Sequence, residues 1–260
     1  MKVIENERMK GMLAEERYSE ILRVVNEEHA VTVQELTELL DTSESTIRRD
    51  LTTLHKRGEL VKVHGGAIAV ESGYTTKDAA LSVRRDLNRE VKQKIGKYAA
   101  TLVQADDFVY LDAGSSVDIM IDYLTQADAV YVTNSIGHAQ KLLQKGFRVI
   151  LIGGELKAIT EAIVGADAIS GLRKYNFTKG FFGTNGVHPD AGYTTPDIAE
   201  AMVKEKAMEQ CRECFVLADA TKINQISSVT FSAFEDAKLL TIGIADEKYK
   251  KYKNVMEVEA

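Results

Sequence analysis

The chain has 260 residues, with 33 lysines and arginines against 39 aspartates and glutamates and a formal net charge of −6 at pH 7. This balance excludes a protein that binds nucleic acid through its overall charge, so any such contact must come from a local patch. Its length and its apolar fraction of 45% suit a domain of about 70 residues followed by a larger one with a full core. The sequence shows neither an apolar run of about 18 residues nor a signal-peptide pattern, so we expect a cytoplasmic protein that does not contact a membrane.

The N-terminal part of the chain predicts three short helices. Residues 1–11 fit no core pattern and are expected to be an extension. Apolar residues within 21–25 mark the first helix, and the Thr-Val-Gln-Glu sequence at 32–35 is a capping box that starts the second. A tight polar turn then leads to Ser43, a favoured N-cap residue, and to a third helix over 43–56.

The third helix carries a pattern that is typical of DNA recognition. Ile47, Leu51 and Leu54 share one apolar stripe, so the polar side chains project from the opposite face, where base edges and phosphates can be met. Neighbouring Arg48 and Arg49 diverge by about 100° on a helix. One of them can therefore reach a base edge while the other reaches a phosphate, and the sequence leaves open which does which.

A wing follows this helix. The apolar runs 60–63 and 67–70 are separated by two glycines, which permit the positive φ of a hairpin turn, and the whole pattern is that of a winged helix-turn-helix. Winged helices also serve as protein-interaction modules, and paired arginines can be an ordinary solvated face. Asp50 would be repelled by phosphate, so we expect it to hold a neighbouring arginine or to face the protein. We favour binding to double-stranded DNA, with contacts from Ser43, Ser45, Thr46, Arg48, Arg49, Thr52, Lys62 and His64.

A change of pattern divides the chain after the wing. Residues 71–95 carry charges of both signs and indicate a polar connector that passes into a helix. We place the boundary near Glu71, which gives a DNA-binding domain at 1–70, a linker and helix at 71–95, and a larger domain at 96–260.

The larger domain alternates short apolar strands with longer helical segments. Such alternation predicts an α/β domain with a mainly parallel sheet that is covered by helices on both faces. The expected strands lie at 108–111, 130–132, 149–152, 181–182, 215–217 and 239–242.

Small polar residues follow most of these strands, and open parallel sheets bind ligands beyond the carboxyl ends of their strands. Gly114 allows close approach, Ser115 and Ser116 can donate hydrogen bonds, and the next helix offers free amides and the positive end of its dipole. A phosphate suits this loop, although a tight turn with serine caps has the same residues. The predicted ligand site comprises Asp112, Gly114, Ser115, Ser116, Asn134, Ser135, Gly153, Gly154, Thr184, Asn185, Glu200, Asp219 and Lys222.

Three of these residues have ordinary structural alternatives. Glu200 and Asp219 can accept hydrogen bonds from sugar hydroxyls, or they can be an exposed helix residue and a turn cap. Lys222 can neutralise a phosphate, or it can be solvated.

Several kinds of chemistry find no motif in the sequence. Neither the Gly-x-Gly-x-x-Gly fingerprint nor a P-loop occurs, so we expect no nicotinamide or nucleotide cofactor. Cys211 and Cys214 form one Cys-x-x-Cys at what looks like a helix end, without the second ligand pair of a structural zinc site. We therefore expect buried or idle thiols and no bound metal.

Two groups of motifs together resemble the DeoR family of bacterial repressors. The Ser-Thr-Ile-Arg-Arg-Asp-Leu sequence at 45–51 and His-Gly-Gly-Ala at 64–67 resemble the family's N-terminal signature. The resemblance runs from about Met12 to the C-terminus. Residues 191–197, followed by Glu200 and Ala201, look like the fructose-operon repressors of Gram-positive bacteria. The family's effector domain is resembled by Leu-Asp-Ala-Gly-Ser-Ser at 111–116, Thr-Asn-Ser at 133–135, Gly-Thr-Asn-Gly-Val at 183–187 and Leu-Ala-Asp-Ala-Thr-Lys at 217–222.

The resemblance implies a repressor that binds operator DNA and has a C-terminal domain related to ribose-5-phosphate isomerase. That domain would bind a phosphorylated sugar, which for the fructose-type subfamily is fructose 1-phosphate. The resemblance also implies a homo-oligomer, either a dimer or a tetramer, whose recognition helices can address two half-sites. On this chain the family's phosphate loop falls on 114–116, and Asn134, Ser135 and Lys222 complete the pocket.

The chain departs from the family pattern at a few positions. The family often has two threonines after the loop glycine and a serine before the lysine, where this chain has Ser115, Ser116 and Thr221. Hydroxyl groups are kept in each case, so the phosphate role is not weakened. Thr178 stands where an aspartate is frequent, which puts any family role for that position in doubt.

A sugar-phosphate isomerase with an accessory DNA-binding domain is the main alternative. Isomerisation needs a positioned base, usually a carboxylate. Where the isomerase relatives carry Asp-Gly-Ala-Asp-Glu, this chain reads Phe-Gly-Thr-Asn-Gly at 182–186, so those carboxylates are absent. Asp112, Glu200 and Asp219 remain as other carboxylates near predicted element ends, and we expect no catalytic residues.

Overall fold

The structure is a computed structural model, and it describes residues 13–28, 30–56, 59–63, 65–69, 74–75, 87–244 and 246–258. The chain divides into two compact units, Met1–Ser72 and Gly73–Ala260. The division falls within the segment that we predicted as linker and helix, and the helix α6 (Arg89–Thr101) belongs to the second unit. The predicted extension 1–11 and the predicted DNA contact His64 lie outside the described residues.

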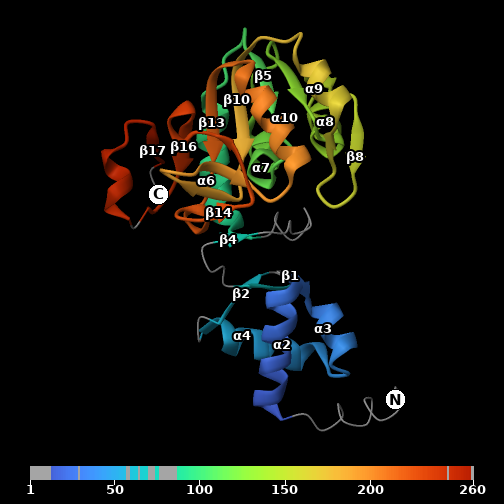
Figure 1. Cartoon of the computed structure of the whole chain (residues 1–260). Helices are drawn as coiled ribbons and strands as arrows, with labels where there is room; N and C mark the ends of the chain where they lie inside the picture. The colour runs from blue at the N-terminus through green and yellow to red at the C-terminus, as the bar shows by residue number, and fades with distance from the viewer. Residues whose placement is uncertain are drawn as a thin grey trace. The chain divides into compact units, whose positions relative to one another are not determined.

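The first unit is a winged helix, as the sequence predicted. Its helices are α2 (Ala14–Glu28), α3 (Val33–Leu39) and α4 (Glu44–Lys56). Its sheet has the order β1-β3-β2 and antiparallel pairing, with β1 at Ala30–Thr32, β2 at Leu60–Val63 and β3 at Gly66–Ala69 (Figure 1). Gly65 in the hairpin turn has a φ of +87°, which glycine adopts without steric cost. The apolar stripe of α4, made of Ile47, Leu51 and Leu54, packs into the core with Ile21 of α2 and Leu36 of α3.

Local hydrogen bonds fix the start of α3. The Thr32 hydroxyl accepts a hydrogen bond from the Glu35 amide at 3.1 Å, and the Glu35 carboxylate accepts one from the Thr32 amide at 2.8 Å. The predicted capping box is therefore confirmed, and such a cap stabilises a helix by about 1 kcal/mol.

A buried ion pair joins α2 to the recognition helix α4. The Arg17 guanidinium donates from Nε and Nη2 to the Asp50 carboxylate at 2.5 and 3.1 Å. Asp50 is only 3% exposed, and a carboxylate buried to this extent needs a cationic partner. The expectation that Asp50 holds an arginine is confirmed, and that arginine comes from another helix.

The second unit contains a seven-stranded sheet with the order β17-β16-β13-β10-β5-β6-β7, in which every neighbouring pair is parallel. Seven strands side by side form the centre of this unit, and α10 (Ile198–Glu209) crosses the near face in Figure 1. The strands are β5 (Phe108–Leu111), β6 (Val130–Thr133), β7 (Arg148–Leu151), β10 (Phe177–Gly183), β13 (Cys211–Leu217), β16 (Lys238–Thr241) and β17 (Val255–Glu257). The predicted mainly parallel α/β domain is confirmed.

Successive residues of the central strands point to opposite faces of this sheet, and helices cover both faces. Val109 and Phe181 pack in a core with α6, α7 (Ser115–Tyr123) and α8 (Ile136–Gln144). Tyr110 and Phe182 pack in a second core with α9 (Ala166–Leu172) and α10. Because both faces are buried there, the C-terminal halves of β10 and β13 are runs of buried, mostly apolar residues and do not alternate with polar ones.

Smaller elements surround the sheet, and the sequence did not predict them. They are the hairpin β8 (Glu155–Lys157) and β9 (Ala162–Val164), and an antiparallel sheet of β11 (Gly186–His188), β12 (Gly192–Thr195) and β15 (Val229–Ser232). The short strands β4 (Tyr74–Thr75) and β14 (Ile226–Ser227) pair in parallel. Three 3₁₀ turns complete the described elements: η1 (Ala220–Lys222), η2 (Phe234–Asp236) and η3 (Glu247–Lys251).

The position of the cysteines differs from the prediction. Cys211 and Cys214 lie in β13 and not at a helix end, because α10 stops at Glu209 and the strand begins two residues later. The neighbouring Cys214 thiol, and to a lesser degree burial, raise the pKa of Cys211, and neither thiol forms a disulfide. No group of three metal-binding side chains occurs among the described residues. None of the helices in the part of the chain that was described is long and apolar enough to cross a membrane.

A second buried charge ties β5 to β10. Asp107, directly before β5, accepts hydrogen bonds from the Lys179 ammonium at 2.6 Å, the Thr178 hydroxyl at 2.7 Å and the Gln104 amide at 2.7 Å. Burial by itself raises the pKa of Asp107, but these donors outweigh it, and the pKa lies below its ordinary value of 3.8. Thr178 thus has a structural partner in this chain.

The ion pair between Arg17 and Asp50 predicts a large effect of substitution. Arg17→Met should lower the free energy of unfolding of the first unit by about 3 kcal/mol, because it leaves a buried carboxylate uncompensated. Calorimetric unfolding measures this loss. Arg23→Met is the control, since Arg23 on the same helix forms only exposed ion pairs and its loss should leave the melting temperature unchanged. Equal melting temperatures for the two variants would show that Asp50 does not need Arg17.

The lowered pKa of Asp107 predicts a pH dependence. Its charged form adds stability that is fully present above the ordinary pKa of 3.8 and is lost as the pH falls through the lower folded-state pKa. Asp107→Asn should therefore reduce stability at neutral pH and make the remaining stability fall less between pH 7 and about pH 3. Urea unfolding at several pH values tests this. Asp106→Asn, at the exposed neighbouring position, should keep the native pH dependence.

Candidate functional site

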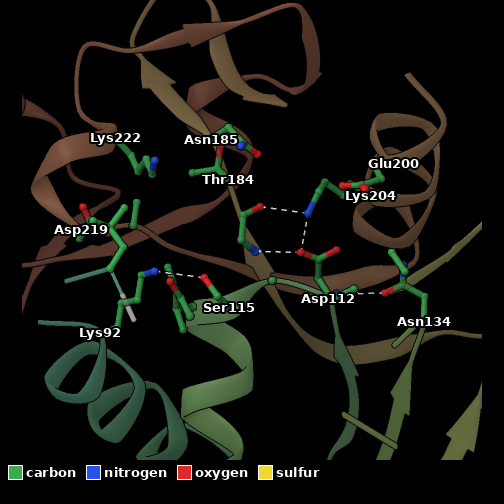
Figure 2. Close-up of a pocket in the computed structure, with 18 residues that line it drawn as sticks. Lys92, Asp112, Ser115, Asn134, Thr184, Asn185, Glu200, Lys204, Asp219 and Lys222 are labelled. Atoms are coloured by element: carbon green, nitrogen blue, oxygen red, sulfur yellow. Dashed lines mark hydrogen bonds and ion pairs between the residues drawn. The ribbon is translucent and has the colours of Figure 1, made fainter. Parts of the chain in front are cut away.

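A pocket lies at the carboxyl ends of β5, β10 and β13, beside the N-terminus of α7 (Figure 2). Ten of the thirteen predicted ligand-site residues line it, although they come from five separate segments of the sequence. These ten are Asp112, Gly114, Ser115, Ser116, Asn134, Thr184, Asn185, Glu200, Asp219 and Lys222.

The floor of the pocket is built by close contact between two strand ends. A Cβ atom on Gly114 would lie 3.1 Å from the Gly183 Cα atom, a tight contact that would push the β5–α7 turn slightly away from β10, so glycine favours this close approach. The Asp112 carboxylate accepts a hydrogen bond from the Gly183 amide at 3.0 Å. Asn134 accepts from the Ala113 amide and donates to the Ile163 carbonyl, both at 3.1 Å, and so ties the end of β6 to the same turn.

Three lysines line the pocket, and each has a different environment. Lys204 on α10 donates to the Asp112 carboxylate and, at 3.1 Å, to the Gly183 carbonyl. Lys92 on α6 donates to the Ser115 hydroxyl at 3.1 Å and is only 4% exposed. Lys222 in η1 is partly exposed, and among the described residues its ammonium has no hydrogen-bond or ion-pair partner.

Two carboxylates complete the polar lining. Glu200 on α10 accepts hydrogen bonds from the Lys157 ammonium at 2.9 Å and the Thr160 hydroxyl at 2.5 Å, both from the β8–β9 hairpin. Asp219 is the N-cap residue of η1, and its Oδ1 atom also accepts a hydrogen bond from the side-chain amide of Asn88 at 3.1 Å. Both carboxylates are less than a tenth exposed. The structure therefore makes them pocket-lining groups, whereas the sequence left open an exposed helix position for Glu200.

Asp197 positions Glu200. Asp197 is the N-cap of α10 and accepts a hydrogen bond from the Glu200 amide at 2.9 Å, and its carboxylate lies 3.0 Å from the Lys157 ammonium. Burial by itself raises the pKa of Asp197. The hydrogen bond from the Glu200 backbone amide and the contact with Lys157 outweigh this effect, so the pKa lies below its ordinary value. The start of α10 and the β8–β9 hairpin are thus held together around one ammonium group.

The N-terminus of α7 gives the pocket its chemistry. Gly114 is the N-cap residue, and Ser115 and Ser116, which are each 8% exposed, begin the first turn. The first amides of a helix have no partner within the helix and carry the positive end of its dipole. With two hydroxyl groups and the nearby Lys92, this turn offers hydrogen-bond donors that can hold an anionic oxygen.

Three predicted ligand-site residues do not line the pocket. Ser135 is buried and caps α8, and its hydroxyl accepts a hydrogen bond from the His138 amide at 3.3 Å. Gly153 and Gly154 form the turn from β7 into the β8–β9 hairpin, and Gly154 has a φ of +148°. The prediction placed them in the site because they follow strands. However, β7 is an edge strand of the sheet, and β6 separates it from β5, whose end forms the pocket.

The sequence analysis did not find Lys92 and Lys204. Lys92 lies in the segment that was predicted as a polar linker and helix, although it shares a helical stripe with the buried residues Ile95 and Ala99. Lys204 lies four residues after Glu200, which places both on one helix face. For Lys92 the available signal was a lysine on an otherwise apolar stripe, and for Lys204 it was the spacing from Glu200. The other lining residues that were not predicted are Leu87, Ala113, Ala162, Gly183, Leu217 and Ala218.

A second candidate surface lies on α4 of the first unit. Arg48 and Arg49 are exposed, and the Arg48 guanidinium lies 3.2 Å from the Glu44 carboxylate. The Lys62 ammonium on the wing donates to the Thr52 hydroxyl at 2.6 Å, which sets the wing against the helix. At the helix start, the hydroxyl of Ser43 forms hydrogen bonds with those of Ser45 and Thr46, both at 2.9 Å. The seven described residues of the predicted DNA contact set thus lie just before α4, on α4 and on β2.

The sequence matches two protein-family profiles. A DeoR-like helix-turn-helix domain matches residues 17–73, and a DeoR C-terminal sensor domain matches residues 87–243. The second match spans the helix that carries Lys92 and every described strand end that lines the pocket.

Curated proteins and solved structures with similarity to this chain were also found. An uncharacterized HTH-type transcriptional regulator, FruR, of Bacillus subtilis (strain 168) is 40% identical over 95% of this chain and 99% of that protein. A lactose phosphotransferase system repressor of Staphylococcus aureus (strain NCTC 8325 / PS 47) is 32% identical over 94% and 98%. A ribose 5-phosphate isomerase A structure from Methanocaldococcus jannaschii is similar with a TM-score of 0.38 and 17% identity, over 52% of this chain and 55% of that chain. That structural likeness is too weak to carry a conclusion.

The two curated relatives are named as a regulator and a repressor, not as enzymes, and the alignments span nearly their full lengths. The winged helix and the parallel-sheet unit correspond to the two matched domains. This chain belongs to the DeoR family of transcriptional regulators.

Proposed function

We propose that this chain represses a sugar-utilisation operon and that a phosphorylated sugar, fructose 1-phosphate, controls its affinity for operator DNA. The observation that carries the proposal is the anion site in the pocket: the first turn of α7, with Ser115 and Ser116, lies among the same lining residues as Lys92 and Lys222. The choice of fructose 1-phosphate is supported by the resemblance of residues 191–197 to fructose-operon repressors.

The phosphate is placed at the first turn of α7. Free helix amides, two hydroxyl groups and two ammonium groups are the donors that a phosphate dianion requires. Lys92 already contacts the Ser115 hydroxyl, so a phosphate there can accept from both groups without a large movement. Lys222 has no carboxylate partner among the described residues, and it would supply the unshared positive charge.

The sugar hydroxyls are placed along the rest of the pocket lining. The Glu200 and Asp219 carboxylates can accept hydrogen bonds from hydroxyl groups, and Asn185 can both donate and accept. Figure 2 shows Glu200, Lys204, Asp112 and Asn134 on one side of the pocket and Lys92, Ser115, Asp219 and Lys222 on the other. A ligand with a phosphate at one end and hydroxyl groups along its length suits this arrangement.

Ligand binding can change the contacts of α6, which is the first helix after the connector in the sequence. Asn88 at its N-terminus donates to Asp219, and Lys92 one turn later donates to Ser115. A sugar phosphate that hydrogen-bonds to these acceptors competes for both contacts. Such a ligand shifts DNA affinity only by the difference in its own affinity for the two states, and a tenfold preference corresponds to about 1.4 kcal/mol.

Operator binding is assigned to the first unit, within the proposed domain 1–70. Arg48 and Arg49 on α4 supply base and phosphate contacts in the major groove, and Lys62 on the wing supplies a further phosphate contact. A homo-oligomer is proposed because two recognition helices can then read two half-sites of one operator. The sensing function is assigned to 96–260 together with α6.

The assignment of α4 predicts that Arg48→Ala abolishes operator binding and leaves sugar-phosphate binding intact. Each lost bidentate base contact weakens binding by about 1–3 kcal/mol. The measurement is fluorescence anisotropy with a duplex selected from random sequences by the native protein. Arg23→Ala, an exposed arginine on α2 outside the predicted contact set, is the control. Normal operator affinity in the Arg48 variant would remove this helix from its proposed role.

The phosphate site predicts the reverse behaviour for a variant with Ser115→Ala and Ser116→Ala. Losing two hydrogen bonds to a charged group should weaken fructose 1-phosphate binding by at least tenfold, since each contributes about 1.5–3 kcal/mol. Calorimetric titration measures this affinity. Ser170→Ala, at an exposed position on α9, should bind normally.

A thermal-shift screen of the native chain identifies the ligand class directly. A ligand that binds the folded state raises the melting temperature. Fructose 1-phosphate should produce a larger shift than fructose 6-phosphate or tagatose 6-phosphate, and unphosphorylated sugars should produce none. Equal shifts with phosphorylated and unphosphorylated fructose, or unchanged affinity in the double serine variant, would contradict the phosphate site.

A further inference from the structure

The two sides of the pocket differ in how much positive charge they can offer a ligand. Beside α7, Lys92 donates to the Ser115 hydroxyl, Asp219 is the lining carboxylate, and Lys222 has no hydrogen-bond or ion-pair partner among the described residues. On the opposite side of the pocket (Figure 2), the lining cation is Lys204, and it is paired with the Asp112 carboxylate. Among the described residues, the first side therefore has an uncommitted cation, Lys222, whereas the lining cation of the second side is already paired with a carboxylate.

Lys204 is not available to a second anion. Its ammonium is held by the Asp112 carboxylate and the Gly183 carbonyl and lies 5.5 Å from the centre of the Phe231 ring. Moving it onto a ligand would leave Asp112, which is 2% exposed, as a buried charge without its cation. The same movement would break a contact that holds the end of β10.

Glu200 adds a negative charge on this side. It is 7% exposed, and Lys157 and Thr160 both bind the same atom, Oε1. These two donors fix the position of the carboxylate on the pocket wall. Within the described part of the chain, no partner is recorded for Oε2, so this oxygen can accept a hydrogen bond from a ligand hydroxyl.

We propose that the pocket selects sugars with a single phosphate group and excludes sugar bisphosphates, and that Glu200 is the residue that determines this specificity. The proposal rests on the proposed function and goes further by defining which phosphorylated sugars are bound. A hydroxyl group at the far end of the sugar donates to Glu200. A second phosphate there meets a fixed carboxylate and finds no uncommitted cation, so it is repelled and loses its hydration.

The experiment is calorimetric titration of the full chain with three ligands that share one sugar: fructose 1-phosphate, fructose 6-phosphate and fructose 1,6-bisphosphate. The native chain should bind the better monophosphate at least about tenfold more tightly than the bisphosphate. In Glu200→Gln the side chain keeps its size and one acceptor oxygen but loses its charge. This variant should reduce the preference by about fivefold or more, mainly because bisphosphate binding improves.

A matched control separates this effect from a general change of charge. Glu213 on β13 pairs with Lys238 at 2.7 Å, much as Glu200 pairs with Lys157, but it does not line the pocket. Glu213→Gln should therefore keep the native ratio of affinities. Lys157→Met should change the ratio in the opposite direction, because it removes the cation that partly neutralises Glu200, and it tests the proposal independently if Glu200→Gln folds poorly.

The outcomes are distinguishable. A native chain that binds the bisphosphate as tightly as the monophosphates overturns the selectivity but leaves sugar-phosphate sensing intact. An unchanged ratio in Glu200→Gln, with a native melting temperature, removes Glu200 as its cause. A native chain that binds none of the three ligands contradicts the proposed function, and the selectivity fails with it.

Discussion

The contact of the Asp112 carboxylate with Lys204 and with the amide of Gly183 holds the second unit's pocket together. These groups come from β5, α10 and β10, which are far apart in the sequence, and all three are buried at the carboxyl end of one parallel sheet. A buried carboxylate is tolerated only when a cation and hydrogen-bond donors satisfy it. Satisfying Asp112 therefore fixes how close these three elements come, and that spacing is what leaves a polar cavity beside the N-terminus of α7.

The same physical requirement operates in the first unit. Asp50 lies on the recognition helix but points into the protein, where Arg17 from another helix pairs with it. The neighbouring Arg48 and Arg49 are thereby left on the exposed side. One aspartate within the Arg-Arg-Asp sequence thus orients the helix about its own axis, so that the charges useful for DNA contact face outward and the one that phosphate would repel faces inward.

The link between the two proposed activities lies in α6. Lys92 in its first turn and Leu87 just before the helix line the pocket, and the N-cap residue Asn88 is hydrogen-bonded to Asp219. A ligand that binds at Ser115 and Asp219 must change the balance of these contacts. Under the proposed function, regulation would require no special signalling residue, because the helix that follows the connector in sequence is itself part of the pocket wall, and the ligand's preference for one set of contacts would supply the coupling free energy.

The sequence by itself determined the winged helix, the parallel sheet and ten residues of the pocket, because helix caps, strand ends and apolar periodicity are local signals. Ser135 and the glycine pair at 153–154 carry the same local signal but lie outside the pocket, since their place depends on the order of strands in the sheet. The sequence analysis missed Lys92 and Lys204, whose place in the pocket was decided by tertiary structure. A lysine in a helix becomes a pocket residue only when packing buries its ammonium beside a partner from another element, and no local pattern records that partner.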